Sequence, residues 1–294
     1  VLDAMGLPAW QSESAIRMSF GPAITPQEID DACNRIVFAA QALAQSCLTI
    51  DTNVTNDKTE LKGLLQFKVG GSCSWLYVDE KTKSAIFIDP LPELTERIQT
   101  LVTCQGLNLI AVIDTHGHAD HQSCRGIIAN EHLFQQQTDF LGWPTNSKTT
   151  VIFGKELQYI TLGDKWLVKV NTPGHTDDSI SLIMCDPVKA VTDELLVHYA
   201  FCGDLILMDS LGRTNFPTSC EAAMFRSLQL LKSLIGTESL VCPSHDYNNE
   251  FTTSIAAEIS RNPLLAQVIA NDINIEEFAI QKTLLDAHID DQSG

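Results

Sequence analysis

The hydrophobic positions near the N-terminus repeat with the period of a helix. They recur every three or four residues from Ile29 to Leu43, which predicts an apolar stripe along an amphipathic helix. The stripe is preceded by Thr25-Pro-Gln-Glu28, a capping box with proline at the first helical position, and we expect the helix to end near Cys47. The run 15–21 predicts a strand before it. Residues 1–50 are therefore expected to form a strand and a helix.

A different pattern follows the polar stretch 51–60, whose Asn and Asp residues predict a linker. Short β-rich runs separated by turn residues predict strands at 64–69, 73–78, 84–88, 107–113, 151–153, 166–170, 180–184 and 199–207. Helical spacing predicts helices at 92–104, 220–235 and 252–259. Strands and helices mixed in this way predict a layered α/β sandwich over residues 61–294.

Composition supports a globular protein with a large core. Hydrophobic residues make up 44% of the 294 positions and charged residues only 19%. Acidic residues outnumber basic residues by 37 to 19, for a formal net charge of −18, so the surface would repel nucleic acid and anionic lipid. Apolar runs are far shorter than the roughly 18 residues of a membrane span, and Val1 opens no signal-peptide pattern. Nine cysteines without a CxxC pair fit reduced thiols. We expect a cytoplasmic protein that binds neither nucleic acid nor membrane.

Three of the eight histidines fall within six residues, directly after the apolar run 107–113. The cluster is Thr115-His116-Gly117-His118-Ala119-Asp120-His121. Imidazole and carboxylate groups are the usual ligands of zinc and non-haem iron. A polar loop with chance histidines is the alternative, but the density of the cluster argues against it. The cluster therefore predicts a metal site on the loop after a buried strand.

Three later segments have the same form, in which a predicted strand ends in a turn that displays one ligand. They are Pro173-Gly-His175, Gly203-Asp204 and Pro243-Ser-His245. Together with the histidine cluster, and in this order, they resemble the metallo-β-lactamase fold superfamily over residues 64–246. The resemblance implies an αββα sandwich with a metal site at one edge. The superfamily includes dinuclear zinc hydrolases, which would use all seven ligands, and mononuclear iron dioxygenases, which would use a subset, so the ligand inventory alone leaves both open.

The residues around these ligands are similar to the persulfide dioxygenase branch of the superfamily. The stretch Gly212-Arg-Thr-Asn-Phe216 is the most discriminating, and segments 172–179, 202–207, 243–247 and 262–264 add to it. The resemblance implies one Fe(II) per chain, held by His116, His175 and Asp204 as a facial triad of two histidines and one carboxylate. It implies that the remaining candidates orient these ligands by hydrogen bonds or bind a second metal. Those candidates are His118, Asp120, His121 and His245.

The family's substrates are glutathione persulfide and O₂, and its products are sulfite and glutathione. Arg213 is a candidate for binding a carboxylate of the glutathione portion, with a structural ion pair as the alternative. Tyr247 is a candidate for a hydrogen bond near the substrate sulfur, with simple packing beside His245 as the alternative. Two positions depart from the family pattern, since Asn215 stands where Asp is usual and Leu264 where Arg is common. Both departures bear on the substrate rather than on the metal.

Two other functions are alternatives for a chain with this fold. A thioester hydrolase of the glyoxalase II kind would bind two Zn(II) ions and use a metal-bridging hydroxide. Only 49 residues follow His245, whereas such a hydrolase is expected to carry a larger helical C-terminal domain for glutathione. A non-catalytic scaffold with this fold would have broken ligands, and none is broken.

The first fifty residues are similar to a different family. Residues 1–7, 15–21 and 25–30, with the helix that follows, resemble the C-terminal end of a cysteine desulfurase of the class V aminotransferase fold, in which the arginine equivalent to Arg17 binds the substrate carboxylate. We therefore expect residues 1–50 to be a desulfurase-like remnant, 51–60 a linker and 61–294 the dioxygenase domain, with an upstream desulfurase fused to the chain. Family members are commonly dimeric, and the sequence leaves open whether this chain forms a homodimer.

Overall fold

The computed structural model describes residues 24–46, 61–117, 123–133, 136–188 and 195–292. The chain divides into two compact units, Val1–Asp57 and Lys58–Gly294. In the first unit, helix α2 (Pro26–Ser46) begins at the predicted capping box. The Thr25 backbone N–H donates to Glu28 Oε2 at 2.8 Å, and the Glu28 N–H donates to Thr25 Oγ1 at 3.3 Å. The predicted helix is confirmed, whereas the strand at 15–21, the linker 51–60 and Arg17 lie outside the described residues.

The first sheet of the second unit has the strand order β1-β2-β3-β4. The first three strands are antiparallel neighbours, and β3 pairs with β4 in parallel. The crossover between these two runs through a short 3₁₀ turn, η2, and helix α3, and helix α4 follows β4. The bounds are β1 Gly63–Val69, β2 Ser72–Val78, β3 Ser84–Ile88, η2 Pro92–Leu94, α3 Thr95–Gln105, β4 Asn108–Ile113 and α4 Arg125–His132.

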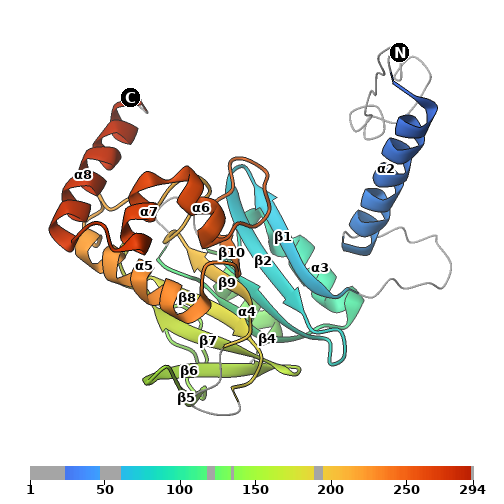
Figure 1. Ribbon diagram of the computed structural model, residues 1–294. Helices are drawn as coiled ribbons and strands as arrows, with labels where there is room; N and C mark the ends of the chain where they lie inside the picture. The colour runs from blue at the N-terminus through green and yellow to red at the C-terminus, as the bar shows by residue number, and fades with distance from the viewer. Residues whose placement is uncertain (1–23, 47–60, 118–122, 134–135, 189–194, 293–294) are drawn as a thin grey trace. The chain divides into compact units, whose positions relative to one another are not determined.

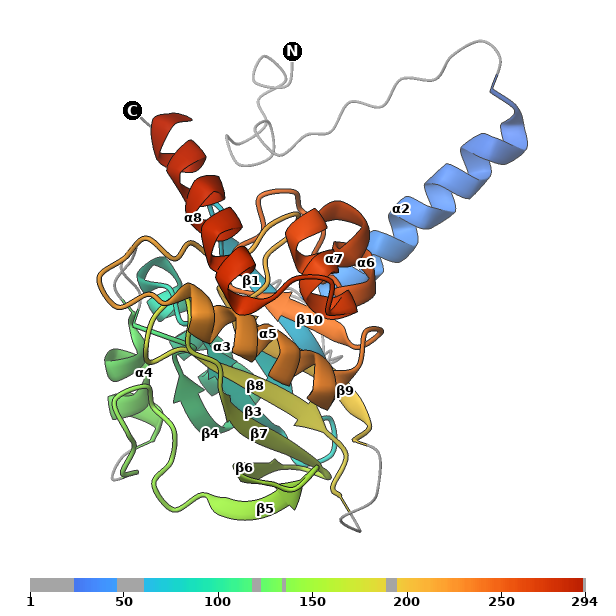
Figure 2. The same ribbon diagram turned by 60° about the vertical axis from the view of Figure 1, so that its left-hand side comes forward.

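The second sheet has the order β10-β9-β8-β7-β6-β5, with β10 and β9 parallel and the other neighbours antiparallel. Helices α5 to α8 lie on its outer side, where α8 packs against α5 and α7 and projects away from the strands, as Figures 1 and 2 show from two directions. The strands are β5 Lys148–Ile152, β6 Lys155–Leu162, β7 Lys165–Asn171, β8 Ile180–Cys185, β9 Val197–Gly203 and β10 Leu240–Pro243. The helices are α5 Glu221–Ile235, α6 Ile255–Arg261, α7 Pro263–Ala270 and α8 Ile275–Gln292.

Apolar residues pack on both faces of the second sheet. One cluster of them lies between the sheets, where Trp75 and Phe201 contact each other edge to face with ring centroids 6.2 Å apart. The other cluster lies between the second sheet and helices α5–α8, where Phe225 and Phe278 pack at 5.5 Å. The predicted αββα sandwich is confirmed. No helix in the described part of the chain has both the length and the apolar character that a membrane span requires.

Some element boundaries differ from the predictions. The strand expected at 199–207 ends at Gly203, because Gly203 adopts a φ of 56° and turns the backbone out of the sheet. The helix expected at 252–259 begins only at Ile255, since Ser254 caps it by accepting from the Ala257 N–H. Strand β6 and helices α4, α7 and α8 were not predicted.

Candidate metal centre

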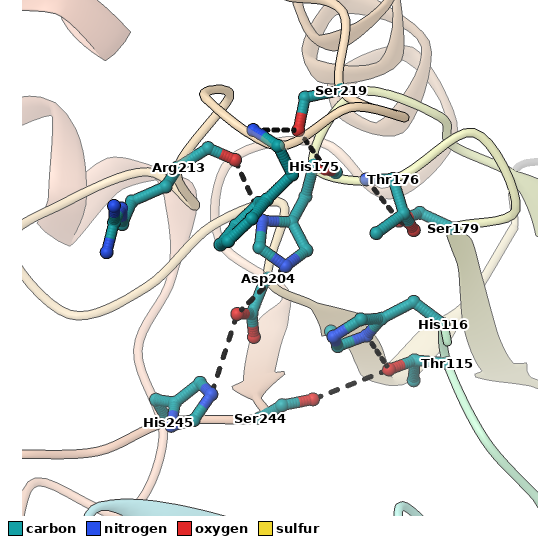
Figure 3. Close-up of polar contacts among 12 residues, drawn as sticks. Thr115, His116, His175, Thr176, Ser179, Asp204, Arg213, Ser219, Ser244 and His245 are labelled. Carbon is teal, nitrogen blue, oxygen red and sulfur yellow. Dashed lines mark hydrogen bonds and ion pairs between the residues drawn. The ribbon is translucent and has the colours of Figure 1, made fainter. Parts of the chain in front are cut away.

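The candidate ligands lie on loops that leave the carboxyl ends of four strands. His116 follows β4, His175 follows β7, Asp204 follows β9 and His245 follows β10. One ligand atom from each of His116, His175 and Asp204 lies within 4.8 Å of the others, and all three residues are buried (Figure 3). The fold thus brings together three side chains that are up to 88 positions apart in the sequence.

His116 is oriented by a hydroxyl group and a buried carboxylate. Its Nδ1 lies 2.9 Å from Thr115 Oγ1, and that hydroxyl donates to Asp89 Oδ2 at 2.9 Å. Because the single hydroxyl proton is used in the bond to Asp89, Oγ1 accepts from the Nδ1–H of His116. The lone pair of Nε2 therefore faces the group of candidate ligands, as a metal-binding histidine requires.

Asp89, at the end of β3, connects three strand ends. It is 1% exposed and accepts from the Thr115 N–H at 2.6 Å and from Ser244 Oγ at 2.5 Å, besides the Thr115 hydroxyl. Thr115 follows β4 and Ser244 follows β10, so the carboxylate joins two sheets beneath the candidate site. Asp89 carries no distinctive signal in the sequence, because an Asp after a strand is also an ordinary turn residue.

His175 is oriented by a backbone carbonyl. Its Nδ1 lies 2.8 Å from the carbonyl oxygen of Arg213, which can only accept, so Nδ1 carries the proton and Nε2 the lone pair. Nε2 lies 3.5 Å from Asp204 Oδ2. The ring packs edge to face against Phe216 at 5.3 Å, and Ser219 Oγ donates to the His175 carbonyl at 2.6 Å. Both histidines thus offer the same nitrogen to the site.

Asp204 fits a cation. The residue is 8% exposed, and its Oδ1 is buried without a hydrogen-bond partner among the described residues. Its Oδ2 lies 3.5 Å from the Nε2 of both His175 and His245. A buried carboxylate oxygen without a partner costs free energy, and a metal ion shared with two imidazole nitrogens removes that cost. The residues present therefore fit a metal ion held by His116, His175 and Asp204.

Glycines beside Asp204 permit this close packing. A Cβ added to Gly212 would lie 1.8 Å from the Asp204 carbonyl oxygen, and one added to Gly203 would lie 2.7 Å from Thr115 Oγ1. Neither position has room for a side chain. Gly212 is therefore needed for the close approach of the Gly212–Phe216 stretch to the backbone of Asp204.

Comparison with solved structures identifies the fold. The structure of ETHE1 from Myxococcus xanthus superposes with a TM-score of 0.56 at 28% identity, covering 73% of this chain and 87% of that one. A metallo-beta-lactamase from Staphylococcus aureus gives 0.57 at 24% identity, covering 75% and 67%. The chain has the metallo-β-lactamase fold, and an ETHE1 protein is among its structural neighbours. No family model matches the sequence.

The relatives of the chain include persulfide dioxygenases and hydroxyacylglutathione hydrolases. The mitochondrial persulfide dioxygenase ETHE1 of Bos taurus is 26% identical over 218 residues, which cover 70% of this chain and 75% of that protein. The cytoplasmic isozyme of hydroxyacylglutathione hydrolase from Saccharomyces cerevisiae is 27% identical over 221 residues, covering 69% and 76%. The predicted resemblance to persulfide dioxygenases is confirmed, and hydrolases are also among the homologues.

The other predicted site residues have different positions. His118, Asp120 and His121 lie outside the described residues. His245 is 7% exposed and lies 3.5 Å from Asp204 Oδ2 through its Nε2, but it is not a member of the group formed by His116, His175 and Asp204. Leu264, one of the two departures from the family pattern, is 3% exposed and packs in the core beneath α5.

Arg213 and Tyr247 lie near ligands without being among them. Arg213 Nε donates to Asn215 Oδ1 at 3.1 Å, and its guanidinium carbon lies 5.4 Å from the centroid of the Phe216 ring. Tyr247 is 72% exposed, and its ring stacks on His245 with centroids 5.7 Å apart. Gly71 makes this stacking feasible, because a Cβ there would meet the tyrosine ring at 2.0 Å.

The cysteines near the site are buried and keep their protons. Cys124 and Cys202 are 3% and 2% exposed, as expected for small core residues. Burial raises the pKa of the Cys202 thiol to about 12. A thiol of this kind is a poor metal ligand at neutral pH, because thiolates are the species that bind metal.

Proposed function

We propose that the chain is a persulfide dioxygenase that binds one Fe(II) through His116, His175 and Asp204. The observation that carries the proposal is this group of two imidazole nitrogens and one carboxylate, within 4.8 Å of one another and buried. Such a triad occupies one face of the coordination sphere and leaves the other open for O₂ and a substrate atom. Homology to the persulfide dioxygenases ETHE1 supports the same activity.

The protein's own residues would hold the metal ion and orient its ligands. Thr115 and the Arg213 carbonyl set the two imidazole rings, and the buried Asp204 supplies negative charge. A bound Fe(II) supplies activation of O₂ and a site for a soft sulfur atom. Holding both substrates beside each other makes their reaction intramolecular, which lowers its entropic cost.

The reaction is the oxidation of glutathione persulfide by O₂. One persulfide, one O₂ and one water give one glutathione, one sulfite and two protons, and O₂ accepts four electrons from sulfur while the S–S bond breaks. We assign Arg213 to a carboxylate of the glutathione portion. Its half-buried guanidinium lies over the ring of Phe216, which packs against His175, and a guanidinium suits a bidentate contact with a carboxylate. Tyr247, exposed beside His245, is assigned to the substrate side of the site.

Metal analysis of anaerobically purified protein, together with O₂ uptake, tests the proposal. We expect about one iron per chain, as the facial triad requires, and O₂ consumption that depends on glutathione persulfide. His175→Ala and Asp204→Ala should lose the iron, whereas His118→Ala should keep part of it. Two zinc ions per chain with hydrolysis of glutathione thioesters would overturn the proposal.

The second candidate is a dinuclear zinc hydrolase acting on glutathione thioesters. It is favoured by the 3.5 Å distance from His245 Nε2 to Asp204 Oδ2, since a carboxylate shared between two metals needs a ligand of the second metal at this place. His245→Ala separates the candidates. It should abolish a dinuclear hydrolase, and it should leave about one iron per chain in a dioxygenase whose ligands are the triad.

For the N-terminal unit we propose a desulfurase-like remnant over residues 1–50, continuous with an upstream desulfurase. A desulfurase produces persulfide sulfur, which a persulfide dioxygenase consumes. Reading the gene upstream of Val1 tests this, and a coding region without a lysine segment for pyridoxal phosphate would contradict it.

A further inference from the structure

Helix α8 carries two charged residues on its buried side. Lys282 and Asp286 are each 2% exposed, stand one helical turn apart and form an ion pair with each other. Buried charges of this kind are rare and need partners. Burial lowers the pKa of Lys282, the Asp286 carboxylate opposes that effect, and the nearby positive charge of Arg213 adds to it. The pair therefore lies under the Gly212–Phe216 loop and is not a surface contact.

Asp286 binds this loop through one residue. Its Oδ2 accepts from the Thr214 N–H at 2.7 Å and from Thr214 Oγ1 at 2.9 Å, while Oδ1 is paired with Lys282. Thr214 is 5% exposed, so without the carboxylate its N–H would be a buried donor without a partner. The contact joins positions 72 residues apart.

The bonded N–H belongs to the same peptide group as the carbonyl that orients His175. The planar unit between Arg213 and Thr214 presents its N–H to Asp286 and its carbonyl oxygen to His175 Nδ1. A carboxylate that accepts from an amide N–H polarises that amide and strengthens its carbonyl as an acceptor. Lys282 pairs with Asp286, Asp286 binds the peptide group, and the peptide group binds His175. Each contact fixes the position of the next group.

We propose that Asp286 is a positioning residue for His175, which acts through the peptide group between Arg213 and Thr214 to set the orientation of the imidazole. The inference rests on the proposed function in that His175 is taken as a metal ligand. It places a carboxylate behind a metal-binding histidine with a main-chain amide between them, in the role that a directly bonded carboxylate has in other metal sites.

The chain offers a matched control. Asp79, in the turn between β2 and β3, is 5% exposed, and its Oδ2 accepts from the Thr82 N–H at 2.8 Å and from Thr82 Oγ1 at 2.7 Å. This repeats the contact of Asp286 with Thr214. The turn lies at the end of β3 opposite to Asp89. Asp79→Asn therefore removes the same negative charge as Asp286→Asn and lies far from the candidate ligands.

The test is titration of the metal-free full chain with Fe(II) under anaerobic conditions. Asp286→Asn should weaken Fe(II) affinity about tenfold, a typical effect of losing a group that supports a ligand, and Asp79→Asn should stay within about twofold of the parent. In the Co(II)-loaded protein, Asp286→Asn should shift the exchangeable Nδ1–H resonance of His175 and leave that of His116 in place. Equal affinities for the two variants, or an unmoved His175 resonance, would overturn the inference.

Two further results keep the test decisive. If Asp286→Asn does not fold, Thr214→Val removes the hydroxyl bond to Asp286 and keeps the peptide contact through which Asp286 is proposed to act. Fe(II) affinity and the His175 Nδ1–H resonance should then stay close to those of the parent, with affinity within about twofold. A tenfold loss of affinity would contradict the inference, because the hydroxyl bond and not the peptide group would then carry the effect. Parent protein that binds no Fe(II) overturns the proposed function and this inference together. Parent protein that binds Fe(II) without consuming O₂ overturns the dioxygenase activity alone.

Discussion

His116 and His175 each reach a buried carboxylate through one intervening group, but the carboxylates come from different parts of the fold. Asp89 lies at the end of β3 and acts through the Thr115 hydroxyl. Asp286 lies on the last helix and acts through a main-chain peptide. The support of His116 is therefore built into the meeting of two sheets, whereas that of His175 depends on the docking of α8.

The largest expected effect is on the Asp89 side. Asp89→Ala leaves the N–H and hydroxyl of Thr115 and the hydroxyl of Ser244 as buried donors without their acceptor. We expect the free energy of unfolding to fall by about 4 kcal/mol and Fe(II) affinity to fall about 100-fold. Chemical denaturation of metal-free protein and anaerobic titration measure the two effects. An Asp89→Ala protein that keeps the parent affinity would show that the sheets do not set His116.

Alanine at Gly203 or at Gly212 should disturb one of the two histidines and leave the other in place. In Gly203→Ala the new methyl meets the Thr115 hydroxyl, and in Gly212→Ala it meets the Asp204 carbonyl and displaces the loop behind His175. We expect each to lower Fe(II) affinity about 30-fold. The Nδ1–H resonances of Co(II)-loaded protein distinguish them, since Gly203→Ala should move that of His116 and Gly212→Ala that of His175. The reverse assignment would contradict the comparison.

Weaker packing of helix α8 should disturb the orientation of His175 and leave that of His116 unchanged. Phe278, fully buried against Phe225, fastens the helix, and Phe278→Ala should cost about 3 kcal/mol of stability. Fe(II) affinity should fall about tenfold, as for Asp286→Asn. Leu101→Ala, on the buried side of α3, is the control, because its expected loss of stability is comparable. If both variants bind Fe(II) alike, loss of stability and not the docking of α8 explains the result.

The smallest expected effect comes from Ser244→Ala. It removes one hydrogen bond to Asp89 and leaves both bonds from Thr115. A loss of about 1 kcal/mol in stability and a change of less than about fivefold in Fe(II) affinity should follow. Affinity that falls as far as in Asp89→Ala would show that Ser244, rather than Thr115, transmits the carboxylate's effect.

The candidate ligands were predictable because each follows a strand in a short recognisable segment. The motifs mark seven candidate ligands, and the resemblance to persulfide dioxygenases selects His116, His175 and Asp204 among them. Their supports were not predictable in this way. Asp89 acts on Thr115 and Ser244, which are 26 and 155 positions away, and a single carboxylate after a strand has no spacing that reveals such partners.

Hydrophobic spacing does not predict helix α8, because several of its apolar residues are exposed and two of its charged residues are buried. Ile280, Leu284 and Leu285 are exposed by 63%, 60% and 49%, while Lys282 and Asp286 face inward. A method that assigns apolar residues to the core finds no consistent face in such a segment. The same arrangement hid Asp286, whose importance depends on a peptide group 72 positions away.

The clamped peptide between Arg213 and Thr214 has an evolutionary consequence. Main-chain amides are the same whatever side chain they carry, so exchanges at Arg213 or Asn215 leave the carbonyl that holds His175 in place, and proline at position 214 is the exchange that deletes the N–H. Substrate preference can therefore drift through the side chains of this loop while metal binding is inherited unchanged. The asparagine at 215, in a stretch otherwise typical of persulfide dioxygenases, is a variation that this arrangement tolerates.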